Sequence, residues 1–179
     1  AEPTPQASAE GRAIVVSEEG AEALVGLGSN LDRPARQIEI AIGMLDAIHE
    51  TSVVAASSLY RSAPLGGIEQ PDFVNAAALL LTGLGARALL EQLQAIERSR
   101  GRERGEVHWG PRVLDLDLLA FGALSIDEPG LTVPHPGIAS RNFVLLPLRE
   151  IAPDFEIPQL GRVRDLPVND SEPRISRIA

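Results

Sequence analysis

Apolar residues recur along this chain at two spacings that alternate from segment to segment. In 22–30, 51–62, 73–83 and 112–122 they alternate with small or polar residues, or run together between Gly, Pro and Asn, as is typical of β-strands. The first of these strands is expected to end at glycine and at a cap-like pair, Ser29 and Asn30.

In 33–50 and 86–101 the apolar residues instead recur every three to four positions, which predicts two amphipathic helices. A further short helix is expected within 140–153. The predicted apolar faces of the two longer helices consist of Ile38, Ala41, Ile42, Leu45 and Ile48, and of Leu89, Leu90, Leu93 and Ile96.

The order of these elements is β-α-β-β-α-β. This order predicts an α+β fold, a ferredoxin-like sandwich in which helices pack on one face of an antiparallel sheet. The two ends of the chain are polar and rich in Pro, so we expect a flexible N-terminal tail (1–22), a single folded domain (23–158) and a C-terminal tail (159–179).

Length and composition agree with one globular domain. The chain has 179 residues, 44% hydrophobic and 23% charged, and no apolar run approaches the roughly 20 residues that cross a bilayer. We therefore expect a cytoplasmic protein without a membrane partner. The net charge of −9 argues against nucleic acid as a partner, because binding a polyanion requires a basic face.

Two residue types are missing, and each absence excludes a kind of chemistry. Without cysteine there is no disulfide, no thiolate metal site and no cysteine nucleophile. Without lysine, all 16 Lys and Arg positions are arginine, which excludes a P-loop lysine and Schiff-base chemistry. Any phosphate binding must therefore rely on arginine.

Asp115 and Asp117 interrupt a predicted strand that is otherwise nearly all apolar. Residues two apart on a strand point to the same face, with Cα atoms about 6.5 to 7 Å apart, while Leu114, Leu116 and Leu118 point to the other face, toward the core. Two carboxylates on one face suit Mg²⁺, which proteins bind together with substrate phosphates, and such a pair could hold two ions. The alternative is that the aspartates only keep an exposed sheet face soluble.

Arginine is concentrated near this pair. Planar guanidinium groups bind phosphate bidentately, so arginines beside two aspartates favour a site for Mg²⁺ and a triphosphate. For any single arginine, the alternative is a solvated surface charge. The candidates are Arg98, Arg100, Arg102, Arg104 and Arg112, with His135 and Arg141 further along the chain.

Five ordered blocks of the sequence resemble the 6-hydroxymethyl-7,8-dihydropterin pyrophosphokinase family, whose members transfer pyrophosphate from ATP to a pterin alcohol in folate biosynthesis and release AMP. The blocks are GSNL (28–31), SSLYRSAPLGGIEQPDFVNA (57–76), LLEQLQAIERSRGRERG (89–105), HWGPRVLDLDLLAFG (108–122) and LTVPHPGIASRNFVLLPLREIAP (131–153). The resemblance covers about 23–155 and leaves both tails outside. It implies a diphosphotransferase, expected to be a monomer, with ATP and a pterin as its small-molecule substrates.

The resemblance also implies roles for single residues on the ATP side. Asp115 and Asp117 would hold two Mg²⁺ ions that bridge the ATP phosphates, and Trp109 would lie in a loop that closes over the bound substrates. Contacts to the phosphates would come from Arg102, Arg112, His135 and Arg141, and further contacts in or beside the ATP site from Gln94, Glu97, Arg104, Leu118 and Thr132.

On the pterin side, the resemblance implies a ring stacked between Phe73 and Phe143. Asn75 would bind the pyrimidinone edge, because an amide offers both a donor and an acceptor. The alternative for the two phenylalanines is ordinary core packing, and for the asparagine a buried structural hydrogen bond. Backbone around Ser62, Pro64 and Leu65 would complete this part of the site.

The implied mechanism is in-line attack by the pterin hydroxymethyl oxygen on the β-phosphorus of ATP, assisted mainly by positioning and charge neutralisation. No side chain is an evident general base, and an aspartate of the pair or a metal-bound water would take the proton. Compared with relatives, His108 replaces a frequent arginine, Ser62 the more usual threonine, Phe73 a tyrosine present in some members, and Gly130 an occasional arginine.

Two other classes of function remain as alternatives. A DxD glycosyltransferase also binds a divalent metal and a nucleotide diphosphate, and would be revealed by affinity for nucleotide sugars. A non-catalytic ferredoxin-like module would bind RNA through exposed aromatics on its sheet, and would be revealed by salt-dependent RNA retention.

Overall fold

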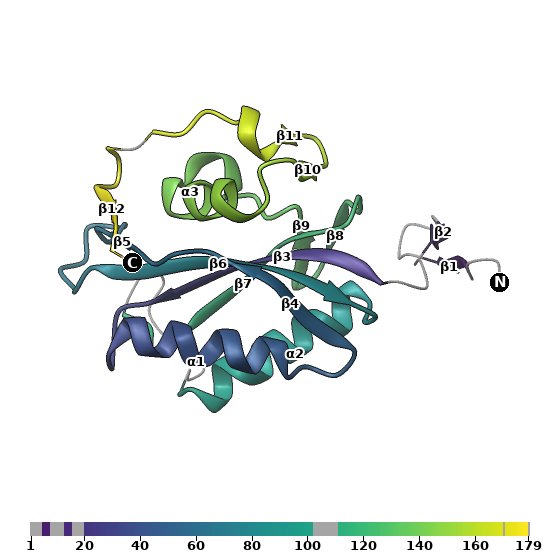
Figure 1. Cartoon of the computed structure of the whole chain (residues 1–179), viewed down its shortest axis with the longest axis horizontal. Helices are drawn as coiled ribbons and strands as arrows, with labels where there is room; N and C mark the ends of the chain where they lie inside the picture. Colours follow the sequence, from purple (N-terminus) through teal and green to yellow (C-terminus); the bar gives the residue numbers. More distant parts are fainter. Residues whose placement is uncertain (1–4, 8–12, 16–19, 102–110, 170, 179) are drawn as a thin grey trace.

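A computed structural model describes residues 5–7, 13–15, 20–101, 111–169 and 171–178 (Figure 1). Its longer elements are β3 (Ala21–Ser29), α1 (Pro34–Asp46), β4 (Thr51–Ala56), β5 (Tyr60–Ser62), β6 (Phe73–Thr82), α2 (Ala86–Ser99), β7 (Asp115–Phe121) and α3 (Asn142–Ile151). Shorter ones are β1 (Pro5–Ala7), β2 (Ala13–Val15), β8 (Ile126–Glu128), β9 (Leu131–Val133), η1 (Ile138–Ser140), β10 (Glu156–Ile157), β11 (Gly161–Arg162), η2 (Val163–Asp165) and β12 (Ile175–Arg177).

A six-stranded antiparallel sheet forms the centre of the fold. Its strand order is β12-β5-β6-β3-β7, and β4 also pairs with β6. β4 and β5 lie along the same side of β6, against its C-terminal and N-terminal parts respectively. The central strand β3 places Gly28 opposite Asn75 on one neighbour and opposite Asp115 on the other.

Helices cover both faces of this sheet. α1 and α2 lie on one face and α3 lies on the other, together with the hairpin of β10 and β11 (Figure 1). The sequence predicted helices on one face of the sheet only. The short helix α3 does not follow this prediction, because its apolar residues pack against the face of the sheet opposite to α1 and α2. None of the described helices is long and apolar enough to cross a membrane.

Each face of the sheet has its own apolar core. Under α1 and α2 the core contains the predicted helix residues Ile38, Leu45, Leu89 and Leu93, all 0% exposed. Under α3 it contains Leu24, Leu119, Ile138, Leu145 and Leu148, of which none is more than 1% exposed. Burying an apolar side chain of this size contributes about 1.5 to 3 kcal/mol to folding, so both cores are substantial.

The C-terminal segment packs onto the domain instead of forming the expected tail. β12 pairs with β5 at the edge of the sheet, and Val163 and Leu166 are buried in the core under α3. Non-local pairing of this kind leaves no local sequence pattern, because three residues are too few to show alternation. At the other end of the chain, β1 and β2 pair with each other and not with the main sheet.

Two local predictions are wrong. The strand expected over 51–62 is divided into β4 and β5. Between them the Ser57 N–H donates to the Ala77 carbonyl, and the Ser57 hydroxyl oxygen accepts from the Ala77 N–H, so a side chain replaces the backbone in the regular ladder. Ser29 and Asn30 do not cap α1, which starts at Pro34 after two left-handed residues, Asp32 and Arg33.

Candidate active site

Asp115 and Asp117 lie on β7 and face the same side of the sheet as α3. Directly opposite them on β3 are Gly28 and Gly26. Because glycine has no side chain, Gly28 leaves space beside Asp115, whereas the side chain of Leu119 packs against Gly26, 3.4 Å from where a Cβ would lie. On the reverse face Leu116 is 4% exposed, which confirms that the leucines of this strand point to the core.

A cavity of about 290 Å³ lies over the two glycines and is lined by aromatic, polar and charged groups. Phe73 at the start of β6 and Phe143 at the start of α3 both line it. Both are partly buried, and Phe143 also packs against the apolar core under α3, so this residue contributes to the core as well as to the cavity wall. The other predicted residues that line it are Ser62, Leu65, Asn75, Arg112, Asp115, Asp117, His135 and Arg141.

Asn75 is 5% exposed and is oriented by a neighbouring strand. Its Nδ2 donates to Ser62 Oγ at 2.7 Å, and Ser62 is itself 2% exposed. Its Oδ1 lies on the Gly28 side, where a Cβ added to Gly28 would be 3.6 Å away. The buried hydrogen bond that was one interpretation of Asn75 is therefore present, and the same bond turns the amide toward the cavity.

A second, larger cavity of about 930 Å³ lies between α2, β7 and the hairpin of β8 and β9. Glu97 of α2 is 6% exposed and accepts a hydrogen bond from the Leu116 N–H at 3.0 Å, which ties the helix to the strand that carries both aspartates. Gly130, in the β8–β9 turn with φ of 79°, also lines this cavity. Predicted residues on its wall are Gln94, Glu97, Arg98, Asp115, Asp117, Leu118, Thr132 and His135.

The two cavities meet at three side chains. Asp115, Asp117 and His135 line both of them. A group bound at the aspartates is therefore in reach of molecules in either cavity, as transfer between two substrates requires.

His135 enters the site uncharged. Burial lowers its pKa below the ordinary value, the nearby Arg141 charge lowers it further, and Asp115 partly opposes both. Its Nδ1 accepts a hydrogen bond from the Gly137 N–H at 3.0 Å, so at neutral pH the proton is on Nε2, which can donate to an anion. Arg141 lies against the same glycine, because a Cβ on Gly137 would be 2.6 Å from Arg141 Cζ.

The two carboxylates suit a hard cation such as Mg²⁺ that takes most of its oxygen ligands from water or from phosphate. Among the described residues, no group of three or more His, Asp or Glu side chains is placed to hold a metal ion. Asp115 and Asp117 alone would leave most positions of Mg²⁺ to water or to phosphate oxygens, which is how this ion is usually bound beside nucleotides.

Six other positions that the sequence singled out remain. Arg102, Arg104 and Trp109, as well as the departure at His108, lie outside the described residues. Pro64 sits between the lining residues Ala63 and Leu65. Arg100 donates through Nε and Nη2 to Gln37 Oε1 at 3.1 and 2.8 Å, so its described contacts lie on α1.

Sequence reasoning also missed part of the site. Gly26 and Gly28 form the floor of the smaller cavity, and Val144 lines its wall. The glycines left a signal, since both fall on one face of an otherwise apolar strand, whereas Val144 looks like any other apolar helix residue.

A family comparison matches most of the chain. Residues 24–153 match the model of the 7,8-dihydro-6-hydroxymethylpterin-pyrophosphokinase (HPPK) family. A 2-amino-4-hydroxy-6-hydroxymethyldihydropteridine pyrophosphokinase from Pseudomonas aeruginosa is 50% identical over 134 residues, which cover 75% of this chain and 82% of that protein. One of the same name from Haemophilus influenzae is 42% identical over 144 residues, covering 80% and 89%.

Solved structures share the fold at low sequence identity. The Plasmodium falciparum HPPK-DHPS wild type with pteroate has a TM-score of 0.65 and 16% identity. The match covers 84% of this chain and only 43% of that one.

Proposed function

This chain belongs to the 7,8-dihydro-6-hydroxymethylpterin-pyrophosphokinase family, and we propose that its two cavities each take one of the two substrates of that family's reaction. The reaction is the transfer of a pyrophosphoryl group from ATP to the hydroxymethyl group of 6-hydroxymethyl-7,8-dihydropterin in folate biosynthesis, with release of AMP. The meeting of both cavities at Asp115 and Asp117 is the observation that supports this division.

The pterin occupies the smaller cavity. Its flat ring stacks between Phe73 and Phe143, and each such aromatic contact contributes about 0.5 to 1.5 kcal/mol beyond the burial of apolar area. Asn75, oriented by Ser62, binds the amino-oxo edge of the ring, and the backbone of 62–65 borders the same edge. Gly28 leaves room for the ring above the sheet.

ATP occupies the larger cavity. Its adenosine part lies against Leu118, Thr132, Gln94 and Glu97, and its phosphates extend toward the aspartates. His135 donates from Nε2 to a phosphate oxygen, while Arg112 and Arg141 approach from the side of the smaller cavity. Arg102, Arg104 and Trp109 are assigned to this substrate by resemblance.

Asp115 and Asp117 would hold Mg²⁺ with the phosphate oxygens, and we infer two ions. When bound, the metal neutralises charge on the phosphates. In the reaction a bond forms between the pterin hydroxymethyl oxygen and the β-phosphorus. The bond from that phosphorus to the oxygen bridging the α- and β-phosphates breaks, its electron pair leaves with AMP, and the hydroxyl proton is released. The chain's own residues align the two substrates, since phosphoryl transfer leaves little covalent chemistry to the protein.

At the level of the fold, the strand order supports a ferredoxin-like arrangement. With β4 and β5 counted as one interrupted strand beside β6, the sheet shows the β-α-β-β-α-β elements in the order second, third, first, fourth. We infer that residues 23–158 make up the catalytic unit, with β12 completing its edge. We also propose that the unit acts as a monomer, as the family resemblance implies.

Product analysis tests this function. The protein is incubated with 6-hydroxymethyl-7,8-dihydropterin, ATP and Mg²⁺, and the phosphorus NMR spectrum is followed with a control that lacks metal. The expected products are AMP and a pterin diphosphate, formed only with metal and without ADP. Formation of ADP, or intact ATP in the presence of folded protein, would contradict the proposal.

A further inference from the structure

Asn30 is a buried polar residue that belongs to neither cavity wall. It follows β3 directly, two residues after Gly28, and is 2% exposed. Buried amide groups are destabilising unless their donors and acceptors are paired, so the partners of Asn30 show what its side chain does.

One set of partners is the backbone of Arg112. The Asn30 N–H donates to the Arg112 carbonyl at 3.0 Å, and the Arg112 N–H donates to Asn30 Oδ1 at 2.8 Å. This reciprocal pair fixes the backbone from which the Arg112 side chain enters the smaller cavity.

The other partners lie on the opposite side of the site. Asn30 Nδ2 donates to Gln70 Oε1 at 2.9 Å and to the Pro71 carbonyl at 3.0 Å. Gln70 and Pro71 belong to the connection between β5 and β6, whose Ala63 and Leu65 line the smaller cavity and which leads into Phe73. Both amide hydrogens and the amide oxygen of Asn30 are therefore used, and they join the pterin-side loop to Arg112.

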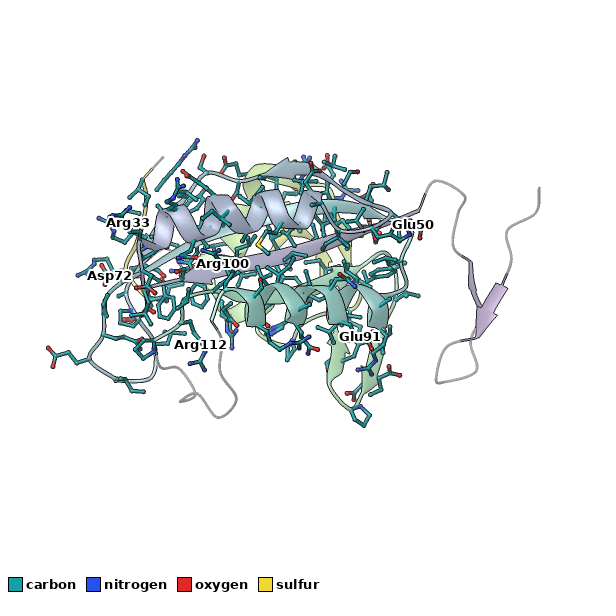
Figure 2. All side chains as sticks on the ribbon, turned by 90° about the horizontal axis from the view of Figure 1, so that it is seen from below. Arg33, Glu50, Asp72, Glu91, Arg100 and Arg112 are labelled. Atoms are coloured by element: carbon teal, nitrogen blue, oxygen red, sulfur yellow. The ribbon has the colours of Figure 1, made fainter. Side chains whose placement is uncertain are left out.

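The backbone after Asn30 is held in an uncommon conformation. Asp32 and Arg33 have φ of 52° and 62°, left-handed values that non-glycine residues adopt at an energetic cost. Gln37 supports this turn, since its Nε2 donates to the Asp32 carbonyl at 3.0 Å while its Oε1 accepts from Arg100. Figure 2 shows Arg33, Arg100 and Arg112 at the same end of the molecule.

We propose that Asn30 is a positioning residue that couples the pterin-side loop to Arg112, so that the pterin pocket and the phosphate contact of Arg112 are set by one buried amide. The inference rests on the proposed function. It predicts that loss of the amide changes both pterin binding and turnover, whereas loss of the Gln70 contact alone changes mainly pterin binding.

Steady-state kinetics of Asn30→Ala, Gln70→Ala and the double variant test the coupling. For Asn30→Ala we expect a KM for the pterin about tenfold higher and a kcat about tenfold lower, the size of effect expected when buried hydrogen bonds to a polar group are lost. For Gln70→Ala we expect a several-fold higher KM for the pterin with unchanged kcat. The double variant should resemble Asn30→Ala, because both substitutions break the same link.

The controls separate this inference from the proposed function. Wild-type protein and the variant Gln159→Ala are assayed in parallel. Gln159 is exposed, and its side chain makes a weak hydrogen bond to Ser125 at 3.4 Å. Turnover by these two proteins tests the proposed function independently of the coupling. Circular dichroism melting and pterin affinity by fluorescence accompany each variant. If Asn30→Ala does not fold, the pterin KM of Gln70→Ala is compared with that of Gln70→Glu. The glutamate keeps an acceptor oxygen for Asn30 and the alanine does not. The coupling would be overturned if the wild type is active and the Asn30 and Gln70 variants have the same KM and kcat as the wild type. It would also be overturned if the changes in free energy from the two single substitutions simply add in the double variant.

Discussion

At the scale of single residues, the site depends on two glycines as well as on the charged side chains. Gly26 and Gly28 stand opposite the two aspartates and line the smaller cavity together with them. Two substrates can then approach the same pair of carboxylates from different sides.

Gly28→Ala should weaken pterin binding without disturbing the fold. The added Cβ would be 3.6 Å from Asn75 Oδ1 and 4.0 Å from Phe73 Cδ1, ordinary contact distances that cause no strain but fill the cavity floor. We expect a several-fold higher KM for the pterin with little change in the melting temperature. Gly43→Ala, whose Cβ meets nothing within 4 Å inside α1, is the matched control and should stabilise by about 1 kcal/mol. Equal kinetics for the two variants would contradict this role of Gly28.

Asp117→Asn should remove most of the turnover. The neutral amide keeps the shape of the side chain but binds Mg²⁺ poorly, and we expect kcat to fall by roughly 10²- to 10³-fold, as when one group that stabilises transition-state charge is lost. Asp154→Asn serves as the control, because Asp154 lines neither cavity and is paired with Arg164. Near-normal kcat for Asp117→Asn, with melting like that of the wild type, would refute the metal assignment.

At the scale of elements, a polar cluster joins α3 to β5 beside the site. Glu150 of α3 accepts hydrogen bonds from the Ser58 N–H and hydroxyl and from the Tyr60 hydroxyl at 2.8 Å. Burial tends to raise the pKa of Glu150, but these hydrogen bonds and the charge of Arg177 outweigh it and lower the pKa. Because Phe143 is on the same helix, the cluster also helps to fix the wall of the pterin cavity.

Tyr60 gives this cluster a pH signature. Burial, followed by the hydrogen bond and the negative charge of Glu150, raises the pKa of Tyr60 to about 12, and Arg177 partly opposes this. An unfolded tyrosine ionises near pH 10, so the stabilisation is complete below about pH 10 and declines as the pH rises toward 12.

The measurement is direct because Tyr60 is the only tyrosine in the chain. The ultraviolet absorbance of tyrosinate, followed during an alkaline titration of the folded protein, should show ionisation well above pH 10. Glu150→Gln should bring it closer to pH 10. Ionisation near pH 10 in the wild type would show that the contact is absent.

The spacing of apolar residues along the sequence predicted the helices and the strand that carry the site. The features that it did not predict are too short to show a period or are held by contacts between residues far apart in the sequence. The apolar spacing of 33–50 and 86–101 anticipated α1 and α2, and the alternation around the aspartates anticipated β7. The hairpin of β8 and β9 and the edge strand β12 have three residues each, too few to show a period. Asn30 and Arg112 are 82 residues apart, so no local pattern could reveal their hydrogen bond.

At the scale of the whole molecule, local charge matters more than net charge. The chain carries −9 overall, yet Arg112 and Arg141 line the cavity that also contains both aspartates. Figure 2 shows Arg33, Arg100 and Arg112 toward one end of the molecule, where Asp72 also lies, and Glu50 and Glu91 toward the other. An acidic protein can therefore present arginine side chains to a nucleotide at this site, because screening in salt solution limits the effect of distant charges.

The most direct test of the account is a crystal structure of the protein with Mn²⁺, a non-hydrolysable ATP analogue and 6-hydroxymethyl-7,8-dihydropterin. The anomalous scattering of manganese locates the metal independently of the organic ligands. The account predicts metal at Asp115 and Asp117, the pterin between Phe73 and Phe143, and adenosine in the larger cavity against Leu118 and Thr132. Metal bound away from the two aspartates, or both substrates in one cavity, would contradict it.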